Sequence, residues 1–231
     1  MSITFGDLKT RISYFVPELT TTEIGKHINN RYQQLLHSFP WSFLKKQTTL
    51  TLTANQSLYS LASDVKEVLD VIISSTKLIQ RTLVWLDQKD SGRTAAAGLP
   101  TDWCNRGLDA NNYCQIELYT KPSAAYTSAT YNYISKKSDL SADTDVIVLR
   151  DDVLQEASLI DCYRHAFSKN PNYANLVVHA TSEYEKKIID AVAEDLRIAY
   201  PEFIIQNQVK EETLGIAYWL QHWYVSLMKR V

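Results

Sequence analysis

Two pairs of adjacent carboxylates are the residues of this sequence best suited to acid–base chemistry. Asp151 and Asp152 form one pair, and Glu194 and Asp195 form the other. Two carboxyl groups that flank one bond can serve as general acid and general base, as they do in glycoside hydrolysis. Each pair also has a structural explanation, because acidic side chains stabilise helix N-termini and occupy exposed helix faces. We favour the structural explanation.

Other catalytic patterns are missing from the sequence. It has no GxSxG elbow and no glycine-rich phosphate loop, and its histidines lack HExxH or HxH spacing. The cysteines are odd in number and lack CxxC spacing, which argues against a zinc site and a disulfide framework. The five histidines are His27, His37, His165, His179 and His222, and the three cysteines are Cys104, Cys114 and Cys162. We therefore expect no metal, no cofactor and no enzymatic activity.

Charge is nearly balanced over the chain but not along it. The formal net charge is -2, which gives no strong field for nucleic acid or an anionic membrane. Residues 1–46 carry 6 basic and 3 acidic groups, whereas residues 151–200 carry 5 basic and 9 acidic groups. The two segments therefore have opposite formal charge, and contacts between them should weaken with salt. No signal sequence and no membrane span is recognised, so a reducing cytoplasm is expected.

Helical periodicity at both ends of the chain predicts the elements that position these groups. Residues 1–46 contain two apolar stripes at helical spacing, with threonines at 4 and 20–22 suited to N-caps. Residues 150–200 contain two more stripes, and Pro171 separates them into a helical hairpin. The N-terminal helices need a partner to bury their stripes, and the hairpin provides it.

A β-rich antiparallel insertion is predicted at residues 47–149, where the period changes to about 2. Alternating Thr and Leu in residues 48–61 predict a β-hairpin. Further strands are predicted at 68–73, 103–106, 113–119, 129–134 and 146–149. Residues 82–86 fit either a strand or a short helix, and the small residues of 91–100 predict a mobile loop. The predicted fold class is α+β, a helical bundle with a β-rich insertion.

Residues 201–231 are predicted to form a C-terminal helical tail that docks on another chain. Its apolar and aromatic side chains follow helical spacing and would leave a large apolar surface on a free monomer. These candidate partner-binding residues are Ile216, Trp219, Leu220, Trp223, Tyr224 and Leu227.

Several sequence segments, in this order, resemble phage head–tail adaptor (connector) proteins. The segments are PWSFLKKQTTLTL, NQSLYSLASDVKEVLDV, GLPTDW, QIELYTKPSAAYTSATYNYI and LSADTDVIVLRDDVLQEASLIDCYRHAF. The resemblance covers roughly residues 1–199 and lies in order and spacing rather than in a catalytic signature. It implies a structural virion protein assembled in the host cytoplasm, which forms a ring, expected to be a 12-mer, beneath the portal.

This resemblance also implies partners. They are other copies of the chain, the portal protein, a downstream tail or nozzle protein and passing DNA, without a membrane. Basic pairs are the candidate DNA-channel contacts, namely Lys45, Lys46, Lys136 and Lys137. Two other functions stay open from residue types alone. One is a cell-wall-degrading or carbohydrate-binding phage tail protein that uses the paired carboxylates, and the other is an adhesin-like binding module with an aromatic groove.

Overall fold

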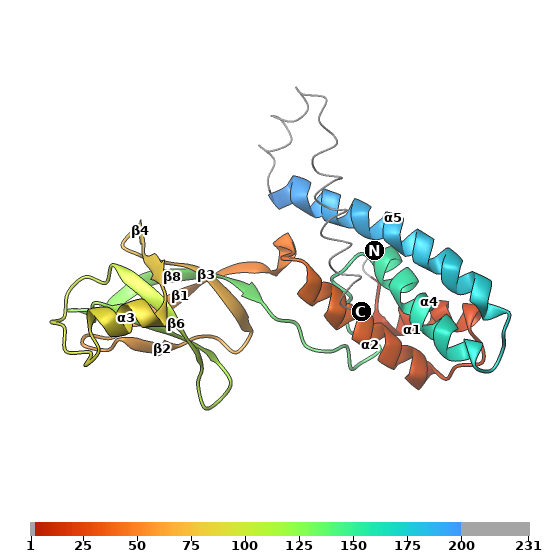
Figure 1. Ribbon diagram of the computed structural model, residues 1–231, viewed down its shortest axis with the longest axis horizontal. Helices are drawn as coiled ribbons and strands as arrows, with labels where there is room; N and C mark the ends of the chain where they lie inside the picture. Colours follow the sequence, from red (N-terminus) through yellow and green to blue (C-terminus); the bar gives the residue numbers. More distant parts are fainter. Residues whose placement is uncertain (1–2, 200–231) are drawn as a thin grey trace, which may run out of the picture. The chain divides into compact units, whose positions relative to one another are not determined.

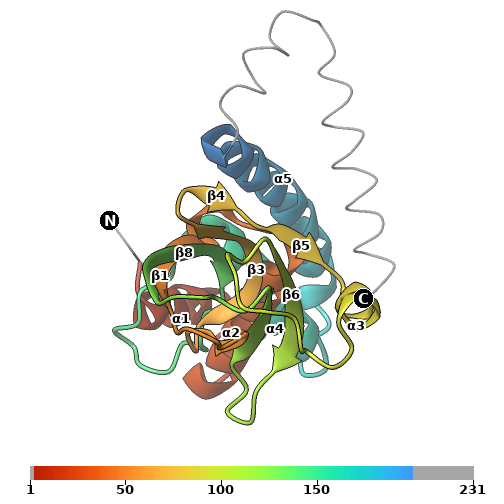
Figure 2. The same ribbon diagram turned by 90° about the vertical axis from the view of Figure 1, so that its left-hand side faces the viewer.

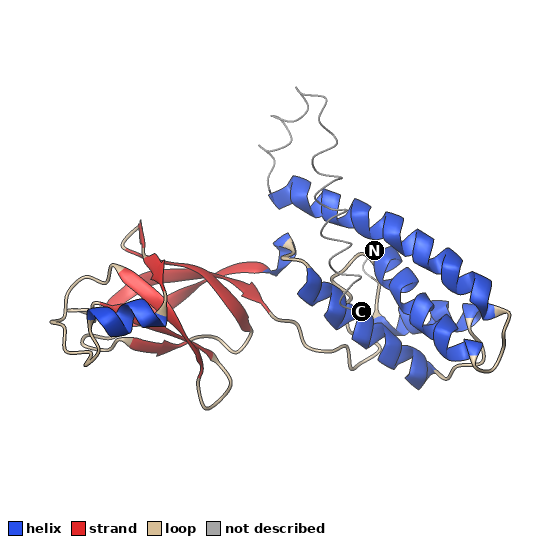
Figure 3. Cartoon of the chain, in the orientation of Figure 1, coloured by secondary structure: helices blue, strands red, loops and turns tan. Residues whose placement is uncertain are grey.

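The computed structural model describes residues 3–199, which divide into two compact units. Phe43–Lys137 form the β unit, and the described residues before and after that segment form the helical unit. Helices dominate one unit and strands the other (Figure 3). This composition confirms the predicted α+β fold class.

Capping boxes start both N-terminal helices, α1 (Phe5–Phe15) and α2 (Thr21–Ser38). The Thr4 hydroxyl accepts a hydrogen bond from the Asp7 backbone N–H, and the Asp7 carboxylate accepts one from the Thr4 backbone N–H. Thr20 and Glu23 repeat this arrangement at α2. Each box satisfies N–H groups that the first turn of a helix leaves without partners, as the threonine positions predict.

Helix α4 (Asp151–Phe167) lies in the middle of the helical unit, between α5 (Tyr173–Ala199) on one side and α1 with α2 on the other (Figures 1 and 2). Buried residues therefore occur around most of its circumference, as expected for a helix with neighbours on several sides. The hairpin prediction is correct, and Pro171 lies in the connection between α4 and α5. One residue of the predicted apolar face is exposed, because Phe167 lies at the last position of α4.

Two four-stranded sheets make up the β unit, with strand orders β1-β8-β3-β4 and β2-β7-β6-β5. The strands are β1 (Lys45–Leu52), β2 (Leu58–Ser60), β3 (Val65–Ile73), β4 (Thr76–Lys77), β5 (Ile79–Arg81), β6 (Asp102–Leu108), β7 (Cys114–Tyr119) and β8 (Tyr126–Ser135). All paired strands are antiparallel except β5 and β6. Apolar side chains from both sheets form one core, including Leu52, Val71, Trp103 and Ile116.

The β-hairpin predicted for residues 48–61 is wrong. Strand β1 pairs with β8, and β2 pairs with β7, so the two consecutive strands lie in different sheets. Leu52 from the first strand and Tyr59 from the second both enter the common core. Local alternation identifies which face of a strand is buried, but it does not identify the distant strand with which it pairs.

The uncertain segment 82–86 belongs to helix α3 (Leu83–Lys89), where the Thr82 hydroxyl caps the Trp85 backbone N–H. The strand predicted at 146–149 is wrong, since this segment forms only an isolated bridge between Val146 and Thr4. The other predicted strands are present with different ends.

In segment 91–100, the Arg93 guanidinium donates to Asp87 and Glu117, so that the loop is anchored to α3 and β7.

Candidate interaction surfaces

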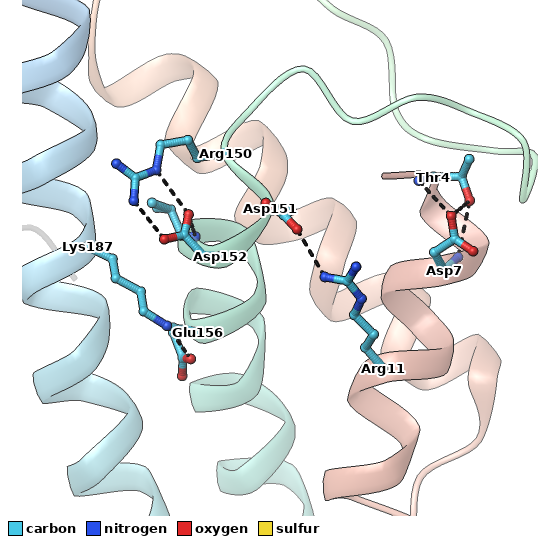
Figure 4. Close-up of polar contacts among 9 residues, drawn as sticks. Thr4, Asp7, Arg11, Arg150, Asp151, Asp152, Glu156 and Lys187 are labelled. Carbon is cyan, nitrogen blue, oxygen red and sulfur yellow. Dashed lines mark hydrogen bonds and ion pairs between the residues drawn. The ribbon is translucent and has the colours of Figure 1, made fainter. Parts of the chain in front are cut away.

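The first carboxylate pair connects helices. Asp151 accepts a hydrogen bond from Arg11 of α1 at 3.0 Å, while Asp152 accepts two from Arg150 at 3.1 and 2.7 Å (Figure 4). These hydrogen bonds from Arg150 lower the pKa of Asp152 against the opposing effect of burial. A carboxyl group held ionised in this way is a poor general acid. Both side chains have structural partners, but α4 has no side-chain cap, so ion pairs rather than the expected helix capping explain this pair.

The second carboxylate pair is divided between two environments. Glu194 is exposed and accepts from Arg150 at 3.2 Å. Asp195 is buried and accepts from both the backbone N–H and the hydroxyl of Ser42, at 2.9 and 2.6 Å. The exposed helix face expected for this pair is therefore correct for Glu194 and wrong for Asp195, which instead fixes Ser42, after the end of α2, to α5.

Two of the five histidines contact each other. His27 Nε2 and His165 Nδ1 lie 3.0 Å apart and share a hydrogen bond between α2 and α4. His165 Nε2 lies 3.8 Å from a carboxylate oxygen of Glu23. Within residues 3–199, no three His, Cys, Asp or Glu side chains are grouped so that they could hold a metal ion. His222 lies outside the described residues.

All three cysteines are free and buried. Burial raises the pKa of the Cys162 thiol to about 12 and also raises the pKa values of Cys104 and Cys114. The thiolate is the reactive form of cysteine, so these side chains contribute to packing and are unsuited to nucleophilic attack.

The structure brings together the four lysines predicted as DNA-channel contacts. Strand β1 starts at Lys45 and pairs with the end of β8, and Lys136 and Lys137 follow directly after β8. The Lys46 ammonium contacts Asp64 at 2.7 Å, and this hydrogen bond raises the lysine pKa. The lysines therefore lie at the end of the β unit where the chain enters and leaves it.

A family model described as SU10 adaptor protein matches residues 3–202. The chain belongs to this family of phage head–tail adaptors. The match covers both units of this adaptor and agrees with the resemblance found in the sequence segments. No protein in a search of curated proteins matches the chain.

The tail residues expected to bind a partner lie outside the described part of this adaptor. They are Ile216, Trp219, Leu220, Trp223, Tyr224 and Leu227. Among residues 3–199, no helix combines the length and apolar character needed to cross a membrane.

Some of the opposite charges of the N-terminal helices and the hairpin pair with each other within one chain of this adaptor. Arg31 of α2 donates to both carboxylate oxygens of Asp161 on α4, at 2.6 Å each. Arg11 pairs with Asp151, and Lys9 pairs with Asp143. Arg11, Arg31, Asp151 and Asp161 are therefore already paired within one chain.

Sequence reasoning missed an open groove of about 420 Å³ on the helical unit of the adaptor. It lies along α1 and α2 and is lined by Phe5, Lys9, Thr21, Thr22, Gly25, Lys26, Asn29, Asn30 and Asp139. Gly25 makes the close approach of the two helices possible, because a Cβ there would lie 3.2 Å from the Phe5 ring. This glycine was the one local signal in the sequence, and the groove itself depends on tertiary packing.

Proposed function

We propose that the protein is a subunit of a closed ring that joins the portal to the tail and continues the DNA channel. Membership of the adaptor family across residues 3–202 is the observation that carries this proposal. The ring is expected to contain 12 copies, to match the portal. A further tail or nozzle protein would bind below it.

The internal ion pairs support a structural role without catalysis. Residue type alone makes the four carboxylates of the two pairs candidates for acid–base chemistry. In the structure each of them contacts a cation or caps a backbone segment. In the part of the chain that the structure describes, the two carboxylate pairs therefore contribute to helix packing. The cell-wall-degrading alternative gains no specific support from this geometry.

Two parts of the chain receive roles in the assembly. The lysine cluster Lys45, Lys46, Lys136 and Lys137 would contact the phosphates of passing DNA without reading its sequence. The segment 201–231 would dock on the portal through its aromatic side chains, in the manner of an amphipathic helix in a groove.

Co-sedimentation of the full-length protein with its purified portal tests the proposal. We expect one ring of adaptor per portal ring, with Asp152→Asn behaving as wild type in assembly. Failure to bind the portal, together with peptidoglycan turnover that Asp152→Asn abolishes, would support the enzymatic alternative instead.

A further inference from the structure

A closed ring of identical subunits requires two different surfaces on each subunit, one for each neighbour. The helical unit has two such surfaces on opposite sides of α4. One is the groove on α1 and α2, and the other is the outer face of α5 (Figures 1 and 2).

The groove is directed away from α4. On α2, the residues that contact α4 are His27 and Arg31, through His165 and Asp161. Thr22, Lys26 and Asn29 line the groove and, at 100° per residue, lie on the opposite side of the helix. The groove is therefore not covered by any helix of residues 3–199.

The side of α5 that does not contact α4 carries exposed apolar and charged side chains. The side chains of Val178, Ile189 and Ile198 are 71%, 45% and 69% exposed. Val178 and Ile189 are separated by 11 residues, or about three helical turns, and thus lie on the same side of α5. Ile198 follows Ile189 by nine residues, about 180° around the helix, and therefore lies on the opposite side of α5. The apolar part of this face is contributed by Val178 and Ile189.

The charges of the two surfaces are complementary. Lys26 and Asp139 border the groove, whereas Asp190 and Arg197 lie exposed on α5. Within the described residues none of these four side chains has an ion-pair partner, unlike Arg11, Arg31 and Lys9. Asp190 and Arg197 are seven residues apart, about 10 Å along one face of the helix. The groove thus offers a cation, Lys26, and an anion, Asp139. Helix α5 offers a counter-ion for each of them, Asp190 and Arg197.

We propose that α5 of a second copy of this chain lies in the α1–α2 groove, with Lys26 facing Asp190 and Asp139 facing Arg197 across the contact. The proposal rests on the ring proposed above and identifies the two surfaces that close it. Repetition of this contact around the ring buries every groove and one exposed side of every α5, so no subunit retains a free end.

Charge reversal tests this contact in the full-length protein. Lys26→Glu and Asp190→Lys should each raise the protein concentration needed for assembly by roughly tenfold, because each places like charges together. Their combination should restore assembly to within about threefold of wild type, since the pair is re-formed with exchanged signs. Lys66→Glu, the same charge change at an exposed position of β3, should leave assembly unchanged.

Cross-linking provides an independent measurement. A subunit carrying both Lys26→Cys and Asp190→Cys should form disulfide ladders up to the closed ring under oxidation, whereas either single substitution should not. The native cysteines are buried and do not interfere. The proposed contact would be overturned if the double-cysteine protein stayed monomeric after oxidation, or if the single charge reversals assembled normally.

The state of the wild-type protein separates this result from a failure of the proposed function. Wild-type rings without the predicted cross-links would leave the proposed function intact. A wild type that forms no ring even with the portal would contradict the function itself.

Discussion

Arg31 of α2 and Asp161 of α4 form a two-pronged ion pair, in which two N–H groups of the guanidinium each donate to one carboxylate oxygen at 2.6 Å. The side chains are only 14% and 22% exposed. This contact joins the N-terminal helices to the hairpin, two parts of the bundle that are separated by the whole β unit in the sequence.

Removal of one partner of this pair should destabilise the helical unit. We expect Asp161→Asn to lower the free energy of unfolding by about 2 kcal/mol, because the Arg31 charge then stays largely buried without its counter-ion. Chemical denaturation measures the change. Asp151→Asn is the matched control, since Asp151 and Arg11 are 45% and 52% exposed, and it should cost less than about 1 kcal/mol. Equal effects of the two substitutions would show that burial does not determine the contribution of the Arg31 pair.

Acidification should weaken the contact between α2 and α4. Burial lowers the pKa of His27 below its ordinary 6.5, and the neighbouring His165 and Arg31 act in the same direction against Asp161 and Glu23. The unfolded chain therefore binds this proton more readily, and stability is lost as pH falls from about 7 through the lowered pKa. Unfolding measured across this pH range should show a smaller slope for His27→Gln than for wild type. An unchanged slope would assign the pH dependence to other groups.

Asp195 and Glu194 are adjacent in sequence but should differ in their contribution to stability. Asp195→Ala leaves the Ser42 backbone N–H and hydroxyl without their acceptor and should cost about 2 kcal/mol. Glu194→Ala, at a side chain that is 61% exposed, should cost less than about 1 kcal/mol. Thermal and chemical unfolding of both variants measure the difference. If Glu194→Ala proved the more damaging, the assignment of Asp195 as the buried cap would be wrong.

The C-terminal segment should be needed for portal docking and not for folding. We expect Trp219→Ala combined with Trp223→Ala to weaken co-sedimentation with the portal more than about tenfold, because aromatic anchors contribute strongly to helix-in-groove contacts. Deletion of residues 202–231 should abolish docking and leave the melting temperature unchanged. A large fall in melting temperature would show that the segment belongs to the core of its own subunit.

Local signals predicted the helices well, because capping and periodicity act over a few residues. Thr4 and Thr20 cap helices as expected, and Pro171 separates α4 from α5. The strand pairing could not be obtained in the same way, because β1 pairs with β8 some 80 residues further along the chain. Pairing over such distances is determined by the packing of both sheets around a common core.

The candidate surfaces show the same division between local and tertiary information. Adjacent charges in the sequence identify Asp151 and Asp152 as candidates, but only the folded chain shows that Arg11 and Arg150 are their partners. The lysine pairs were visible in the sequence, whereas their meeting at one end of the β unit follows from the β1–β8 register. The groove lined by Lys26 had no sequence pattern of its own, since it is formed by residues of α1, α2 and the segment after β8.

Cryo-electron microscopy of the full-length protein bound to its portal tests the ring proposal most directly. The account predicts a single closed ring of 12 subunits coaxial with the portal, with Lys45, Lys46, Lys136 and Lys137 facing the channel. It also predicts α5 of each subunit in the α1–α2 groove of its neighbour. An open or monomeric attachment to the portal, or density on the virion surface away from the portal axis, would contradict the proposal that this chain continues the DNA channel.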